Sequence, residues 1–118
     1  MSTMTLDRRF TLPTHGVIEL LLGLVTLVSP ALLPFGNGGM VAAVLLGSLL
    51  VGMGVAIGGD QGAAPGWHHL LDLVSVMATA IVALGLALAG EPYGALFFAA
   101  LTVIRSGLNV TTRYVART

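Results

Sequence analysis

The stretch "THGVIELLLGLVTLVSP" (residues 14–30) decides the fold, because it is apolar enough for a lipid bilayer and yet holds a carboxylate. From Val17 onward it has the composition of a helix that crosses the hydrocarbon core, which is about 30 Å thick. Glu19 lies inside this apolar run, one helical turn after His15. A charged group in a membrane span is costly unless a partner satisfies it. The stretch therefore predicts a membrane helix with a specific polar partner elsewhere in the chain.

Three further apolar stretches of similar length follow. The four predicted spans are residues 14–35, 38–59, 67–89 and 93–113. They are separated by short segments rich in Gly and Pro, residues that interrupt helices. Because short connections make neighbouring helices run antiparallel, we predict an all-α membrane protein, an antiparallel up-down bundle of four transmembrane helices. Residues 1–13 are expected to be a cytoplasmic N-terminal segment, and residues 114–118 a cytoplasmic tail.

The composition favours the same class of protein. Of the 118 residues, 56% are hydrophobic and 8% are charged, and the mean hydropathy is +0.97. A soluble domain has about 25% charged residues. Basic and acidic residues balance, so no net field attracts nucleic acid. The absence of cysteine excludes disulfides and thiolate chemistry. We expect the lipid bilayer as the surroundings and no nucleic-acid partner.

The arginines outside the spans predict the orientation. Arg8 and Arg9 precede the first span, Arg113 and Arg117 close the chain, and the three connecting loops hold none. Loops and ends rich in arginine stay on the cytoplasmic side. Both termini are therefore expected in the cytoplasm.

The two halves of the chain share a pattern. When His15 is aligned with His68, Glu19 falls opposite Asp72. Each half then opens with His-x-x-x-acid, followed by an apolar helix, a Gly-containing turn and a second apolar helix. Identities are few. The pattern marks either two tandem two-helix repeats, related by an axis along the membrane normal, or a chance likeness.

One segment resembles a known family. "LLLGLVTLVSPALLPFGNGG" (residues 20–39), leading into the small-residue helix "GSLLVGMGVAI", resembles the SPW-repeat family of small bacterial integral membrane proteins. Gly23, Ser29 and Pro30 match the family's motif, and Ala31 stands where the motif has tryptophan. The resemblance implies a multi-pass protein of the bacterial cytoplasmic (inner) membrane, and it implies no defined activity.

Polar side chains inside the spans are expected to meet. Glu19 and Asp72 lie near the starts of their spans, and Arg105 lies before the end of the last span. At 1.5 Å per residue, these three groups reach a similar depth below the cytoplasmic surface. We therefore predict that Arg105, whose guanidinium can serve two acids, neutralises both. The predicted buried cluster consists of His15, Glu19, His68, His69, Asp72, Arg105 and Asn109.

Three functions are compatible with this cluster. It fixes helix register in a structural, assembly or binding module. Alternatively, it serves a channel or transporter for protons, ions or a small polar solute, a role suited to imidazoles. The third alternative is a metal or haem site, with His15, Glu19, His68 and Asp72 as the metal ligands. Against it, the first and third helices are diagonal in a simple bundle, and the Glu-x-x-His pair of di-iron bundles is missing.

We favour the first of these functions, with no metal or cofactor. The sequence has no nucleophile–base pair and no phosphate-binding loop at positions where the predicted fold would make them functional, so no catalytic residues are predicted.

Small residues in the second span predict close helix packing. Ser48, Gly52 and Ala56 form one stripe, and Gly47 and Gly54 lie on a neighbouring face. Small residues let membrane helices approach closely. Two such faces exceed what one neighbouring helix needs. We therefore expect either a central position for this helix or a homo-oligomer or partner membrane subunit on its second face.

Overall fold

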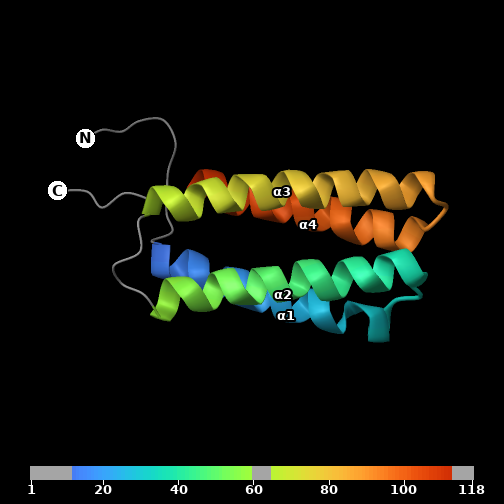
Figure 1. The fold of residues 1–118 in the computed structure, drawn as a ribbon, viewed down its shortest axis with the longest axis horizontal. Coiled ribbons are helices and arrows are strands. Elements are labelled where there is room, and N and C mark those ends of the chain that lie inside the picture. Colours follow the sequence, from blue (N-terminus) through green and yellow to red (C-terminus); the bar gives the residue numbers. More distant parts are fainter. Residues whose placement is uncertain (1–11, 60–64, 113–118) are drawn as a thin grey trace.

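The computed structural model describes residues 12–59 and 65–112. This part of the chain folds into an all-α bundle, as predicted. Its helices are α1 (Leu12–Leu32), α2 (Asn37–Gly59), α3 (Pro65–Leu88) and α4 (Pro92–Thr111). Successive helices run antiparallel, so that α1 begins and α4 ends at the same end of the bundle (Figure 1).

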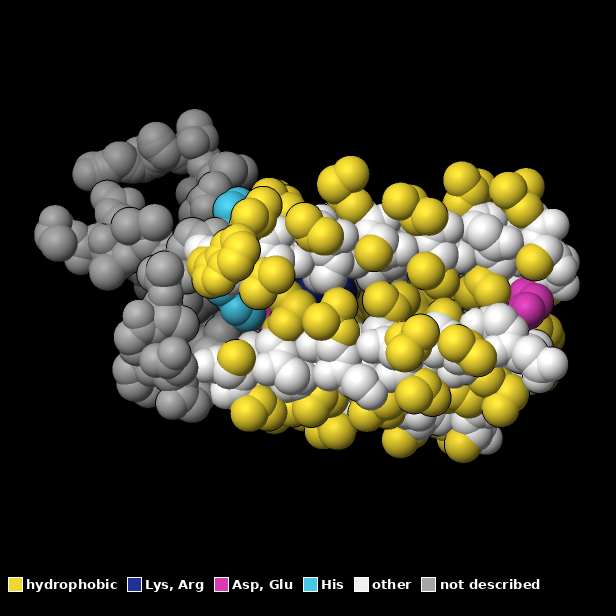
Figure 2. Space-filling model, in the orientation of Figure 1, with side chains coloured by type: hydrophobic (Ala, Val, Ile, Leu, Met, Phe, Trp, Pro, Cys, Tyr) yellow, Lys and Arg dark blue, Asp and Glu magenta, His cyan; other side chains and the backbone are white. Residues whose placement is uncertain are grey.

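Each helix contains a stretch long and apolar enough to cross a membrane. These stretches are Pro13–Leu32, Asn37–Ala56, Trp67–Leu88 and Pro92–Thr111. Large apolar side chains such as Leu45, Met77 and Leu96 are more than half exposed on the outside of the bundle, and apolar side chains cover much of the face seen in Figure 2. Lipid is the solvent that such a surface favours, which supports a membrane protein.

The bundle consists of two helical hairpins. α1 packs closely along α2, and α3 along α4, whereas the two hairpins touch each other at far fewer places (Figure 1). α1 begins at Leu12 and α3 at Pro65, positions that coincide when the two halves of the sequence are aligned. The tandem repeat itself stays a prediction.

Glycine brings the backbones of α1 and α2 together. A Cβ added to Gly54 would lie 2.6 Å from the carbonyl oxygen of Gly16, and one added to Gly23 would lie 2.7 Å from the amide nitrogen of Val51. Neither distance is possible for a real side chain. The first hairpin therefore depends on glycine on both of its helices.

The two small-residue faces of α2 differ in their surroundings. Gly47 and Gly54 are buried against α1. Ser48, Gly52 and Ala56 are exposed, and a Cβ added to Gly52 would meet nothing within 4 Å. This face lies on the outside of the described bundle, whereas the rest of α2 contacts α1, α3 and α4. An oligomer that covers this face stays a prediction.

The Ser29–Pro30 pair is accommodated inside α1. Pro30 has no N–H to donate to the carbonyl oxygen of Thr26, one turn earlier. The hydroxyl of Ser29 donates to that oxygen instead, at 2.7 Å. The helix therefore continues through Pro30 and ends at Leu32, rather than at residue 35 as predicted.

The apolar core occupies the half of the bundle nearer the two hairpin turns. Its buried side chains come from three helices: Ala43, Leu50, Ala83, Leu86, Phe98 and Leu101. Phe98 is completely buried and contacts Phe35, which follows α1. Most of the buried polar and charged side chains lie in the other half of the bundle.

We predict that Gly54→Ala lowers the free energy of unfolding by about 1–3 kcal/mol, the usual cost of overpacking. The added methyl group would collide with the backbone of α1, which has no rotamer to relieve the collision. The matched control is Gly52→Ala on the open face of the same helix, which should leave stability unchanged or slightly raised. Unfolding of the purified protein in one detergent, followed by circular dichroism, measures both. Equal losses in the two variants would contradict the packing.

Candidate functional site

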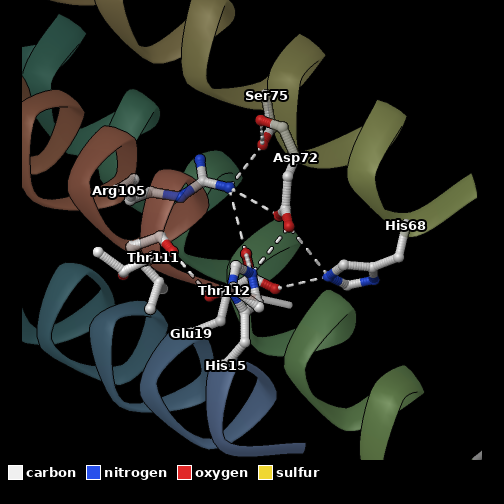
Figure 3. A network of polar contacts seen from close by, with 9 residues as sticks. His15, Glu19, His68, Asp72, Ser75, Arg105, Thr111 and Thr112 are labelled. Atoms are coloured by element: carbon white, nitrogen blue, oxygen red, sulfur yellow. Dashed lines mark hydrogen bonds and ion pairs between the residues drawn. The ribbon is translucent and has the colours of Figure 1, made fainter. Parts of the chain in front are cut away.

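A polar cluster lies where α1 and α3 begin and α4 approaches its end (Figure 3). α1 contributes His15 and Glu19, and α3 contributes His68 and Asp72. In each helix the two residues are four positions apart, so both side chains lie on one face. His15, Glu19 and Asp72 have no exposed surface in the described structure.

Arg105 of α4 joins the two hairpins. Its Nη2 lies 3.3 Å from Glu19 Oε2 in one hairpin and 3.3 Å from Asp72 Oδ1 in the other. The same nitrogen donates a 2.7 Å hydrogen bond to Ser75 Oγ. The predicted contact between the guanidinium and both acids is therefore present, within a side chain that is 1% exposed.

The two imidazoles each reach both carboxylates. His15 Nε2 lies 2.8 Å from Asp72 Oδ2 and 3.4 Å from Glu19 Oε2. His68 Nε2 lies 3.3 Å from Glu19 Oε1 and 3.3 Å from Asp72 Oδ2. Although α1 and α3 pack against different helices, the two imidazole centroids are 5.6 Å apart. The diagonal arrangement of these helices therefore does not keep the four side chains apart.

A hydrogen bond from outside the predicted cluster orients His15. Thr112 Oγ1 donates to the carbonyl oxygen of Leu108 at 2.6 Å, which uses its one proton. His15 Nδ1, 2.8 Å from the same hydroxyl oxygen, must then be the donor. In the neutral imidazole the lone pair is on Nε2 and faces the carboxylates. The sequence places Thr112 on the polar face of the last span but does not reveal this contact.

The charges of the cluster do not balance. Two carboxylates face one guanidinium, so with both imidazoles neutral one negative charge is left over. An uncompensated charge buried in a medium of low dielectric constant costs several kcal/mol. The arrangement therefore calls for one further positive charge, either a proton on an imidazole or a bound cation.

The other two predicted members of the cluster lie close by in the sequence. Asn109 is buried on α4, one turn after Arg105, and His69 follows His68 on α3 and is partly buried. Their place in the cluster stays a prediction.

A second polar contact, missed by the sequence analysis, joins the hairpins at their turns. Glu91 precedes α4, and its carboxylate accepts hydrogen bonds from Gly39 N at 2.9 Å and Gly38 N at 3.2 Å. These amides open α2, where the helix dipole favours a negative charge. A Cβ on Gly38 would lie 2.7 Å from Glu91 Oε2. The only signal in the sequence is an acid in one turn and glycines in the other.

Comparisons with protein-family models, with curated proteins and with solved structures found no match for this chain. The resemblance to the SPW-repeat family stays a prediction. The class that the described fold supports is a membrane protein with a buried cluster of histidine, glutamate, aspartate and arginine.

We predict that Arg105→Met lowers the free energy of unfolding by about 3–5 kcal/mol, because it leaves two buried carboxylates without their counter-ion. The variant Glu19→Gln/Asp72→Asn/Arg105→Met removes all three charges and should be more stable than the single variant. Denaturant unfolding in detergent measures both. If the uncharged variant is the less stable one, charge compensation is not what Arg105 supplies.

We predict that Glu91→Ala costs about 0.5–2 kcal/mol, as the loss of a helix cap does. Glu91→Gln should cost less, because the amide oxygen still accepts a hydrogen bond. Gly38→Ala tests the contact from the other side, since its methyl group would displace the carboxylate. Thermal unfolding compares the three variants, and a Glu91→Ala variant as stable as the native chain would contradict the contact.

Proposed function

We propose that this chain is a membrane-embedded cation-binding module, in which the bound cation helps to join two helical hairpins. The observation that carries the proposal is the convergence of His15, Glu19, His68 and Asp72. One ligand atom from each lies within 4.8 Å of the others, and all four side chains are buried. Beside them Arg105 supplies one positive charge against two negative ones.

The sparse packing between the hairpins supports a role in assembly. Within each hairpin the helix backbones are close together, whereas the two hairpins meet through side chains, in the apolar core and in polar contacts at the two ends of the bundle. Apolar contacts between membrane helices gain little from the hydrophobic effect, because lipid is equally apolar. A cation between Glu19 and Asp72 would therefore add directly to the attraction between the two hairpins.

The proposed location is the bacterial cytoplasmic membrane, with both termini in the cytoplasm. The arginines at the two ends of the chain support this orientation. The cation site would then lie in the cytoplasmic half of the bilayer, because α1 and α3 start at that side. The module would have no catalytic residue, and a homo-oligomer or a partner subunit could cover the exposed Ser48–Gly52–Ala56 face.

Transport of the cation is a weaker alternative. A transporter needs a path from its binding site to each side of the membrane. Two cavities along the described bundle have apolar linings, one between Val41 and Val82 and one between Val25 and Ile104. Neither cavity is lined by the cluster.

We predict that at least one cation raises the melting temperature of the purified chain in detergent. A ligand present at 100 times its Kd stabilises the folded state by about 2.7 kcal/mol. The melting temperature is measured in alkali, alkaline-earth and transition-metal chlorides at fixed ionic strength. It is then measured as a function of pH without added metal salt. A response to pH without any response to metal salts identifies the cation as a proton.

The matched variants separate the site from general salt effects. Glu19→Gln/Asp72→Asn, which removes both negative charges and leaves the positive charge of Arg105, should lose the response, and Glu91→Gln, which removes a carboxylate at the other end, should keep it. A native chain that responds to no cation, or a response shared by the Glu19→Gln/Asp72→Asn variant, would refute the proposal.

A further inference from the structure

We infer that the cation is a divalent transition-metal ion, held by one imidazole nitrogen and one carboxylate oxygen from each hairpin. This inference rests on the proposed function and names its ligand. The ligand atoms are His15 Nε2 and Glu19 Oε1 from α1, and His68 Nε2 and Asp72 Oδ2 from α3.

The spacing of these atoms fits four-coordinate geometry. Metal–nitrogen and metal–oxygen bonds of about 2.1 Å place tetrahedral ligands about 3.4 Å apart. His68 Nε2 lies 3.3 Å from both Glu19 Oε1 and Asp72 Oδ2, and His15 Nε2 lies 2.8 Å from Asp72 Oδ2. All four ligand atoms lie within 4.8 Å of one another, so the pairs that are closer or farther apart than this spacing would move to admit an ion. Two imidazoles with two carboxylates suit zinc and its neighbours better than they suit calcium or magnesium.

The carboxylate oxygens divide between two partners. Asp72 directs Oδ1 to Arg105 and Oδ2 to the imidazoles (Figure 3). Glu19 directs Oε2 to Arg105 and Oε1 toward His68. Glu19 Oε1 is buried and accepts no hydrogen bond from the residues that the structure describes. A buried anionic oxygen with an unused lone pair is the kind of atom that a metal ion satisfies.

His15 is held in the tautomer that binds metal. Its Nδ1–H donates to Thr112, so the Nε2 lone pair of the neutral ring faces Asp72 at 2.8 Å. Two lone pairs at that distance repel unless a proton or a metal ion lies between them. Histidines that ligate metals commonly donate their other N–H in this way, which fixes the orientation of the ring.

Arg105 acts as an outer-shell partner of both carboxylate ligands. It is 3.3 Å from the oxygen of each that does not face the imidazoles. A divalent ion changes the charge of the cluster from one excess negative to one excess positive charge. The guanidinium therefore weakens metal binding compared with a site that lacks it, which favours an exchangeable ion over a permanent one.

Cobalt(II) binding tests the inference on the purified full chain in detergent, after treatment with a chelator. The native chain should bind one equivalent, and the cobalt should show the intense visible absorption of four-coordinate geometry. Zinc should displace it. His68→Gln should lose the absorption, whereas Glu91→Gln, which removes a carboxylate at the other end of the bundle, should keep it.

Thr112→Val supplies a test that leaves every ligand in place. Loss of the outer-shell hydrogen bond should weaken cobalt affinity by about 10–100-fold. A purely structural hydroxyl would lower the melting temperature without changing that affinity, and that result would overturn the assignment. If His68→Gln fails to fold, the cobalt affinity of Thr112→Val and the visible spectrum of the native chain with cobalt decide whether the metal site is present.

The two proposals fail separately. A chain stabilised by alkali ions or by protons, but binding no cobalt or zinc, keeps the cation-binding function and overturns the metal. Cobalt bound without four-coordinate absorption, or bound equally by His68→Gln, also overturns the metal site. A chain that responds to no cation overturns both.

Discussion

The contact of one guanidinium with two acids on different hairpins is the constraint on which this bundle depends. None of the three charges could lie buried in a membrane alone, because each would cost several kcal/mol. Together they are tolerated only if Glu19, Asp72 and Arg105 lie at one level. A shift of one helix by a single turn, about 5.4 Å, would separate them. The charges therefore fix the register of α1, α3 and α4 at once.

The two kinds of helix contact have different physical origins. Within the first hairpin, Gly23, Gly47 and Gly54 allow the backbones to touch, and dispersion forces act over a long interface. Between the hairpins, polar contacts lie at both ends: the cluster at one end and Glu91 with the first amides of α2 at the other. The apolar core around Phe98 lies between them. Specific pairing of the hairpins thus comes from groups that lipid cannot satisfy.

Hydropathy and helix-breaking residues were sufficient to predict four helices, because membrane spans have a fixed length and composition. Depth along a helix was sufficient to pair Arg105 with Glu19 and Asp72, because rise per residue is constant. The sequence placed His15 and His68 in one predicted cluster, but it did not show how their rings contact each other, which depends on how the helices are rotated and how far side chains reach between hairpins. The contact of Glu91 was not predictable either, because its partners are backbone amides. Nor did the sequence show which of the two small-residue faces of α2 contacts α1.

Stability and ligand binding share one set of atoms in this arrangement. A cation that binds between Glu19 and Asp72 binds only when the hairpins are together, so its binding free energy adds to their association. By the same linkage, anything that draws the hairpins apart lowers the affinity for the cation. This coupling acts together with the apolar core, which also joins the two hairpins. Under the proposed function, the cluster joins the two hairpins with a strength that depends on whether the cation is bound.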